Sequence, residues 1–266
     1  MAPAKRVNCL AASLVYSFSM TRNAAVADGT RFQEAARAQV SFLAPLEKRC
    51  LVWLARRTPA WINSDHLTVL GLISLLGAGL SYWYARSNRA GLLLGIVCLS
   101  LNWLGDSLDG TLARVRECQR PRYGFYVDHM VDALGTFFLL GGMALSGYMS
   151  PAVAGGLLVA YFLLSIEVYL ATYTVGTFHI SFWKFSPTEL RILLMISNIA
   201  LLYRPMARIA GHTWPLFDVG GAIGICGMAA MLAVAVARHT AYLYRAERLP
   251  GIAKRAVEAV EGAGVR

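Results

Sequence analysis

Charged residues are scarce in this sequence, which argues against a water-soluble domain. Asp, Glu, Lys and Arg together make up 15% of the 266 residues, whereas 57% of the residues are hydrophobic. Soluble domains usually contain about 25% charged residues and under half apolar ones. A single core of this size could not bury so much apolar surface. We therefore expect an all-α integral membrane protein, because a helix satisfies its own backbone polar groups in lipid.

Paired cysteines are also lacking. The five cysteines are an odd number, and they are widely spaced with no C-x-x-C pair: Cys9, Cys50, Cys98, Cys118 and Cys226. This distribution argues against both a disulfide framework and a zinc site. It indicates free thiols in a reducing compartment.

Basic residues are numerous, but their distribution does not indicate a nucleic-acid partner. The formal net charge is +10, yet no basic stripe interleaved with aromatic residues occurs on a polar segment. The cations lie instead between apolar stretches, where such residues meet anionic headgroups and set the topology. We expect membrane lipids as partners and no nucleic acid.

Long apolar stretches fill most of the chain. Six of them are near the ~20 residues that a span requires, at 66–85, 90–112, 127–147, 150–174, 188–210 and 216–240. The preceding segment 41–58 mixes apolar and cationic residues at helical spacing, which is typical of an amphipathic helix lying in the membrane interface. Together these segments predict a membrane domain at 41–245, between an N-terminal extension of marginal order at 1–40 and a cytoplasmic tail at 246–266.

The positions of Lys and Arg predict how the spans are oriented. Six spans place both termini, the 113–126 loop and the 175–187 loop on one side of the membrane. The opposite side receives four basic residues, Arg86, Arg89, Arg204 and Arg208, and the other side receives all the rest. Because cytoplasmic loops are enriched in Lys and Arg, we expect a multi-pass protein with both termini in the cytoplasm.

Acidic residues gather where the second and third predicted spans meet. Asp106 and Asp109 are three residues apart, and Asp128 and Asp132 are four apart, so each pair shares one helix face. The two helices are consecutive and joined by a short loop. We therefore expect antiparallel neighbours whose acidic faces converge.

Carboxylates at the cytoplasmic edge of a membrane require compensation. An uncompensated Asp in a span costs about 2.5–3.5 kcal/mol on insertion scales, and neighbouring carboxylates repel each other. Divalent cations offset both costs, and all-oxygen ligands favour Mg²⁺, Mn²⁺ or Ca²⁺ over zinc or copper. Nearby, Gly110 and Ala113 either leave space for a nucleotide or only allow close helix packing, and Arg114 supplies a cation for phosphate.

This arrangement resembles the signature of the CDP-alcohol phosphotransferase family, D-x-x-D-G-x-x-A-R followed after eight or nine residues by G-x-x-x-D-x-x-x-D. Every specified position is filled here, by Asp106, Asp109, Gly110, Ala113, Arg114, Gly124, Asp128 and Asp132. The predicted interfacial helix and six spans also resemble the family. The likeness covers about residues 45–245.

The resemblance implies a transferase of phospholipid biosynthesis that moves a phosphoalcohol from a CDP-linked donor to an alcohol acceptor and releases CMP. Mg²⁺ or Mn²⁺, two ions in all, would be held by Asp106, Asp109, Asp128 and Asp132. Asp132 would also be the general base that takes a proton from the acceptor hydroxyl. The nucleotide would be bordered by Asp106, Gly110, Ala113, Arg114 and Gly124. The family likeness further suggests a homodimer.

Two segments beside the signature are candidates for contact with the acceptor or headgroup. His129 follows Asp128 as in the choline/ethanolamine branch of the family, but a helix neighbour points about 100° away and could face another helix instead. Glu189 and Arg191 belong to a Pro-Thr-Glu segment at the start of the fifth predicted span. That segment resembles one found in several family members, although good helix N-terminal chemistry also accounts for it.

Three more polar residues leave alternatives open. Glu167 lies inside the fourth predicted span, where a carboxylate faces a cavity or a partner, so it either binds the acceptor or makes a structural hydrogen bond. Arg120 and Arg122 either attract a phosphorylated acceptor or belong to the excess of cytoplasmic cations.

The sequence does not decide which substrate carries the CDP. The donor is CDP-diacylglycerol with a small polar alcohol as acceptor, or a CDP-headgroup with diacylglycerol as acceptor. A cation transporter is the alternative of another class, but it predicts acidic residues spread along a path through several spans. Here they are bunched at one boundary.

Overall fold

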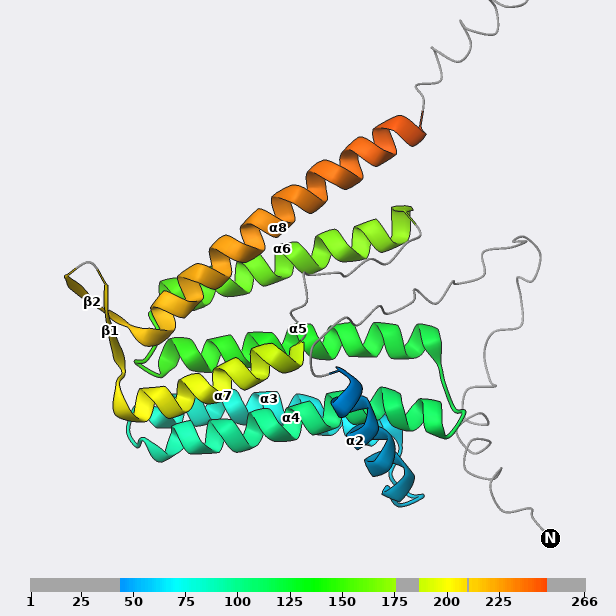
Figure 1. Ribbon diagram of the computed structural model, residues 1–266, viewed down its shortest axis with the longest axis horizontal. Helices are drawn as coiled ribbons and strands as arrows, with labels where there is room; N and C mark the ends of the chain where they lie inside the picture. The colour runs from blue at the N-terminus through cyan, green and yellow to red at the C-terminus, as the bar shows by residue number, and fades with distance from the viewer. Residues whose placement is uncertain (1–43, 176–186, 210, 248–266) are drawn as a thin grey trace, which may run out of the picture.

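The computed structural model describes residues 44–175, 187–209 and 211–247. These residues form seven helices and a two-stranded hairpin (Figure 1), with the bounds α2 Ala44–Arg57, α3 Ser64–Ala85, α4 Ala90–Val115, α5 Pro121–Leu145, α6 Pro151–Val175, α7 Pro187–Tyr203, β1 Met206–Ile209, β2 His212–Pro215 and α8 Leu216–Ala246. The predicted N-terminal extension and nearly all of the predicted tail lie outside the described residues.

Four of the described helices are long and apolar enough to cross a membrane, namely α3, α4, α6 and α8. α5 has 25 residues, but its first half carries Arg122, Asp128 and Asp132. α7 has 17 residues, at the lower limit for a span. The expectation of a helical membrane protein is therefore confirmed, while the number of six spans stays a prediction.

The predicted fifth span at 188–210 is wrong at its C-terminal end. α7 ends at Tyr203, and β1 and β2 pair as an antiparallel hairpin before α8 begins. Pro205 accounts for the helix end, because the residue before a proline is disfavoured in the helical region. In the hairpin, Gly211 has a φ of +84°, which favours glycine.

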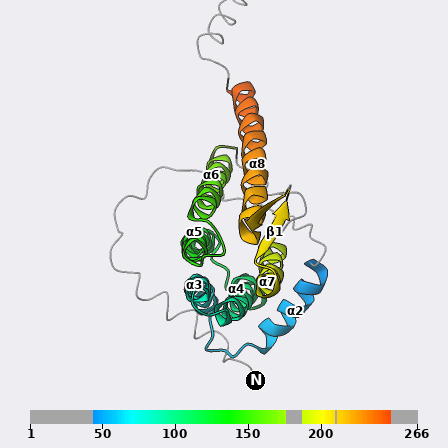
Figure 2. The ribbon, with the colours of Figure 1, turned by 90° about the vertical axis from the view of Figure 1, so that its left-hand side faces the viewer.

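α3 packs closely against both α4 and α5 (Figure 2). A Cβ on Gly105 of α4 would lie 2.7 Å from the carbonyl oxygen of Leu67, and a Cβ on Gly142 of α5 would lie 2.0 Å from the carbonyl oxygen of Gly79. Such backbone approach is how small residues join helices in lipid. α4 and α5 are thus held together through α3, with few direct contacts between them, rather than as the directly packed neighbours that the sequence predicted.

Buried polar side chains attach α7 to α3 and α4. Tyr82 Oη donates to Asn198 Oδ1 at 2.8 Å, and Asn198 Nδ2 donates to the carbonyl oxygen of Leu92 at 3.4 Å. Both side chains are fully buried. Because a buried polar group without a partner is costly, these bonds fix the position of α7 along the other two helices.

α6 and α8 form an outer pair that joins the rest of the bundle mainly where α6 packs on α5 (Figures 1 and 2). The two helices are closest near Gly221, where a Cβ would lie 2.4 Å from Val153 Cγ1. Further along, Glu167 Oε1 lies 2.6 Å from His239 Nδ1. Few of their apolar side chains are buried, as expected of helices surrounded by lipid.

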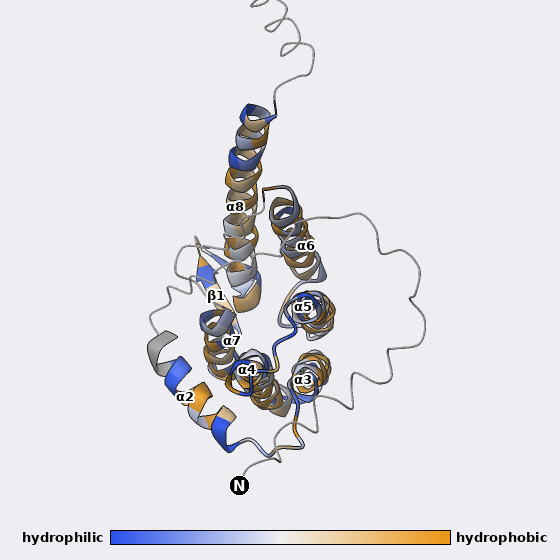
Figure 3. Cartoon of the chain, turned by 90° about the vertical axis from the view of Figure 1, so that its right-hand side faces the viewer, coloured by the Kyte–Doolittle hydropathy of each residue, from blue (hydrophilic) through white to orange (hydrophobic). Residues whose placement is uncertain are grey.

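α2 packs mainly on α4 and lies beside it in the bundle (Figure 2). Hydrophilic and hydrophobic residues are mixed along it (Figure 3). Leu51 and Ala55 are buried against Leu67 of α3 and Leu108 of α4, whereas Trp53 is half-exposed. The predicted helix forms with an apolar face on the bundle, and its place in the membrane interface stays a prediction.

We expect Gly142→Ala to destabilise the protein by about 1–3 kcal/mol, the usual cost of overpacking, because its new methyl group meets the α3 backbone. Gly141→Ala is the matched control, since nothing lies within 4 Å of a Cβ there, and alanine favours the helix. Thermal unfolding of the purified variants in one detergent measures the difference. Equal midpoints for the two variants would contradict the α3–α5 contact.

Candidate active site

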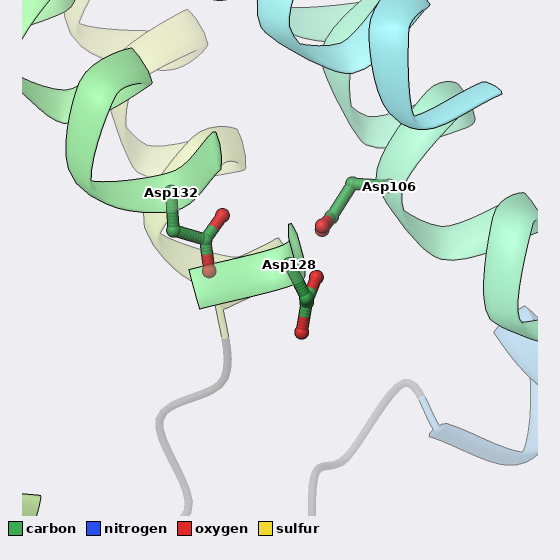
Figure 4. A group of neighbouring side chains, drawn as sticks. All are labelled: Asp106, Asp128 and Asp132. Atoms are coloured by element: carbon green, nitrogen blue, oxygen red, sulfur yellow. The ribbon is translucent and has the colours of Figure 1, made fainter. Parts of the chain in front are cut away.

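α4 and α5 bring three carboxylates together. One oxygen from each of Asp106, Asp128 and Asp132 lies within 4.8 Å of the other two. Asp106 projects from α4 toward Asp128 and Asp132, which come from α5 one turn apart (Figure 4). All three residues are half-buried. The i, i+4 spacing on α5 therefore produces the shared face that the sequence predicted.

The charges of this group fit a divalent cation. Two carboxylates at such a distance repel each other by about 3 kcal/mol at an effective dielectric constant near 20. Among the described residues, Arg191 supplies a cation, because its Nη2 lies 2.8 Å from Asp106 Oδ2. The all-oxygen ligand set suits Mg²⁺ or Mn²⁺.

Asp109 is oriented differently from the other three. Its carboxylate accepts a hydrogen bond from Thr68 Oγ1 at 2.7 Å, and its carbonyl oxygen accepts one from Ser64 Oγ at 2.9 Å. Both partners are on α3. The residue interacts electrostatically with Asp106 and Asp128, but it is not part of the 4.8 Å group. Its role as a metal ligand stays a prediction.

The residues predicted to border a nucleotide lie beside the carboxylates. On α4, a Cβ on Gly110 would lie 3.5 Å from Arg114 Nη1, and Arg114 Nη2 donates to Thr111 Oγ1 at 3.2 Å. Ala113 is half-buried and Arg114 is exposed. On α5, Gly124 is exposed with open space around it. Gly124 thus leaves the surface of α5 open, whereas the side chain of Arg114 lies over Gly110.

α7 contributes Arg191 to the site. The sequence predicted that Arg191 would point at the acceptor or headgroup, whereas its guanidinium contacts Asp106 and its side chain is 13% exposed. Glu189 is half-buried in the first turn of α7. The short α7 therefore forms a wall of the site next to α4.

His129 lies against α6. Its ring lies 4.1 Å from that of Phe125 and 5.0 Å from that of Tyr169, centroid to centroid. Its Nδ1 is 2.6 Å from the carbonyl oxygen of Phe125, and because a carbonyl oxygen only accepts, Nδ1 carries the proton. In the neutral ring Nε2 then carries the lone pair, so this bond does not decide between His129 and Asp132 as the base.

Arg120 and Arg122 lie where α5 begins. Together with Pro121 and Tyr123 they line a shallow hollow of about 480 Å³. Arg120 forms an ion pair with Asp65 and stacks on Tyr123 at 4.0 Å. Arg120 is therefore engaged in ordering the loop, and a contact of either arginine with the acceptor stays a prediction.

Glu167 is directed toward α8. Its side chain is 11% exposed, and its carboxylate contacts His239. Tyr161 and Tyr169 on the same helix interact electrostatically with Asp132 of α5. Glu167 is six residues after Tyr161 and so lies about 120° from it around the helix. A structural hydrogen bond is therefore better supported for Glu167 than binding of the acceptor.

Sequence reasoning missed Glu47. Its Oε1 accepts hydrogen bonds from Trp103 Nε1 at 2.9 Å and Thr188 Oγ1 at 2.9 Å. It is the only acidic residue between positions 41 and 58, which is the one signal that could have drawn attention to it. The partners come from α4 and α7, so their convergence depends on contacts that are distant in sequence.

Comparison with protein families agrees with this geometry. The family model described as CDP-alcohol phosphatidyltransferase matches residues 61–237. The matched stretch contains the three carboxylates, the Gly110–Arg114 segment and all of α7, while α2 precedes it. The family resemblance and the transferase class predicted from the signature are thereby confirmed. The chain belongs to the CDP-alcohol phosphatidyltransferase family, a family of integral membrane enzymes that transfer substituted phosphate groups.

Proposed function

We propose that this protein transfers a phosphoalcohol from a CDP-linked donor to the hydroxyl of an alcohol acceptor, with release of CMP. The observation that carries the proposal is the convergence of Asp106, Asp128 and Asp132 within 4.8 Å, beside the exposed Arg114 and the open surface at Gly124. A pyrophosphate requires both features, because its charge must be neutralised and its nucleotide must lie against a helix. A cation transporter has no use for the second.

In this proposal Asp106, Asp128 and Asp132 hold two divalent cations, Mg²⁺ or Mn²⁺, with Asp109 as a further ligand. The ions supply Lewis-acid neutralisation of the donor pyrophosphate when bound. Arg114 binds a phosphate oxygen by a charge-assisted hydrogen bond. Asp132 accepts the proton of the acceptor hydroxyl, so that this oxygen attacks the β-phosphorus in line and CMP leaves.

Two donor classes remain to be distinguished. With CDP-diacylglycerol the acceptor is a small polar alcohol, and the cationic Arg120–Arg122 hollow offers a place for a phosphorylated one. With a CDP-headgroup the acceptor is diacylglycerol, and the apolar, exposed surfaces of α6 and α8 give access from lipid. The first class has the more specific support, because cationic side chains at the mouth of the site suit a polar anion.

We further propose that the site and both termini face the cytoplasm. The carboxylate end of the bundle carries most of the basic residues, including Arg114, Arg116, Arg120 and Arg122, as the positive-inside rule requires. Those cations and the mixed polarity of α2 suit an anionic lipid surface. A homodimer is expected from the family likeness.

We expect Asp132→Asn to lower CMP release by at least about 10²-fold, because general base catalysis contributes 10²–10⁴ in rate. The assay uses purified protein in lipid with Mg²⁺ or Mn²⁺, and offers CDP-diacylglycerol or a CDP-headgroup separately. Glu117→Gln, a change of the same charge on an exposed loop residue, serves as control. The donor that gives CMP identifies the donor class. An Asp132→Asn variant as active as wild type would refute the role of Asp132 as general base.

We expect Arg114→Gln to raise the KM for the donor by about tenfold or more, since a hydrogen bond to a charged group contributes about 1.5–3 kcal/mol. The exposed Arg49 on α2 provides the matched control: Arg49→Gln removes one cytoplasmic charge but no predicted phosphate contact. Initial rates against donor concentration measure the effect. If both variants shift KM equally, Arg114 acts only through the overall charge.

A further inference from the structure

Three hydrogen-bond donors converge on one carboxylate oxygen outside the acidic group. Glu47 Oε1 accepts from Trp103 Nε1 at 2.9 Å, from Thr188 Oγ1 at 2.9 Å and from Ser107 Oγ at 3.5 Å. Glu47 itself is half-buried on α2. Trp103 and Ser107 are one turn apart on α4, and Thr188 is in the first turn of α7. One side chain thus joins three helices.

The junction that Glu47 forms between α2, α4 and α7 lies within one turn of Asp106 on α4 and within one turn of Arg191 on α7. Ser107 directly follows Asp106 on α4, and Thr188 is three residues before Arg191 on α7. Arg191 and Asp106 form the ion pair at 2.8 Å that bridges the same two helices. At this end α4 and α7 are therefore connected twice, once through Glu47 and once through the Arg191–Asp106 ion pair.

We propose that Glu47 is a positioning residue, which holds α4 and α7 in the register that presents Asp106 to a divalent cation. The inference rests on the proposed metal-dependent function. Removing the Glu47 carboxylate leaves Thr188 and Trp103 without this acceptor, and the start of α7 loses its link to α2 while the Arg191–Asp106 pair remains. Arg191 competes with the cation for Asp106, so any shift of α7 changes how strongly the cation binds.

Attachment of α2 does not by itself require Glu47. Leu51 and Ala55 bury their side chains in the apolar cluster with α3 and α4. Arg116 at the end of α4 donates to the carbonyl oxygens of Thr58 at 2.9 Å and Pro59 at 3.0 Å, just after α2. These contacts anchor the helix on the bundle. A half-buried carboxylate is costly unless it is hydrogen-bonded, and the donors that satisfy Glu47 come from α4 and α7.

The test is the binding of Mn²⁺ alone to purified protein, followed by electron paramagnetic resonance. We expect Glu47→Ala to weaken Mn²⁺ binding by about tenfold, the lower end of the effect of residues that orient metal ligands. Glu47→Gln keeps a carbonyl acceptor and should fall between wild type and Glu47→Ala. Glu117→Gln, with the same loss of charge on an exposed loop residue, should bind Mn²⁺ as wild type does.

Two further variants separate positioning from stability. Leu51→Ala weakens the apolar anchoring of α2 but removes none of the hydrogen bonds to Glu47, so it should lower the unfolding midpoint and leave Mn²⁺ affinity unchanged. Thr188→Val removes one donor with little change of shape and should weaken Mn²⁺ binding less than Glu47→Ala. In combination with Glu47→Ala, Thr188→Val should cause no further loss of Mn²⁺ affinity, because both changes remove the same hydrogen bond. Should Glu47→Ala fail to fold, Thr188→Val carries the test.

The outcomes distinguish this inference from the proposed function. If wild type and Glu47→Ala bind Mn²⁺ equally, or if Leu51→Ala weakens binding as much as Glu47→Ala, the positioning role is refuted while the proposed function stands. If wild type binds no Mn²⁺ and releases no CMP, the proposed function fails and the inference with it. A tenfold loss confined to the Glu47 and Thr188 variants establishes the role.

Discussion

The backbone contacts of α3 with α4 and α5 are the constraint on which the site depends. The carboxylates come from α4 and α5, yet those helices touch each other little, and α3 holds both by contacts that only glycine permits at Gly105 and Gly142. Mutual repulsion of the carboxylates favours separation of the two helices. Rigid backbone packing opposes that repulsion more effectively than flexible side chains would, because interdigitated backbones have no alternative rotamers.

α7 completes the site from the other side of α4. Leu201 packs in the apolar core, and polar bonds fix α7 at both ends: Asn198 with Tyr82 at one, Arg191 and Thr188 with Asp106 and Glu47 at the other. Polar bonds are stronger guides to register than apolar packing in lipid, since the surrounding acyl chains are as apolar as leucine. These polar bonds therefore fix the position of α7 beside the acidic group.

The sequence alone predicted what depends on local spacing. The helix positions followed from apolar length, and Asp128 and Asp132 share a face because they are four residues apart. It did not predict the contacts between distant segments: Asp109 bonds to Thr68, and Arg191 reaches Asp106 across 85 positions of the chain. The end of α7 was missed for another reason. Apolar residues continue past Tyr203, and Pro205 overrides them.

The length of α8 bears on how the protein sits in its bilayer. Its 31 residues rise about 46 Å at 1.5 Å per residue, whereas the hydrocarbon is about 30 Å thick. Even a tilt of about 40°, the upper end for such helices, leaves the helix longer than the hydrocarbon. The hairpin holds its first turn at one end of the bundle, and hydrophilic residues occupy its last turns (Figure 3). The length of α8 thus exceeds the thickness of the hydrocarbon, and we expect its hydrophilic last turns to extend beyond it.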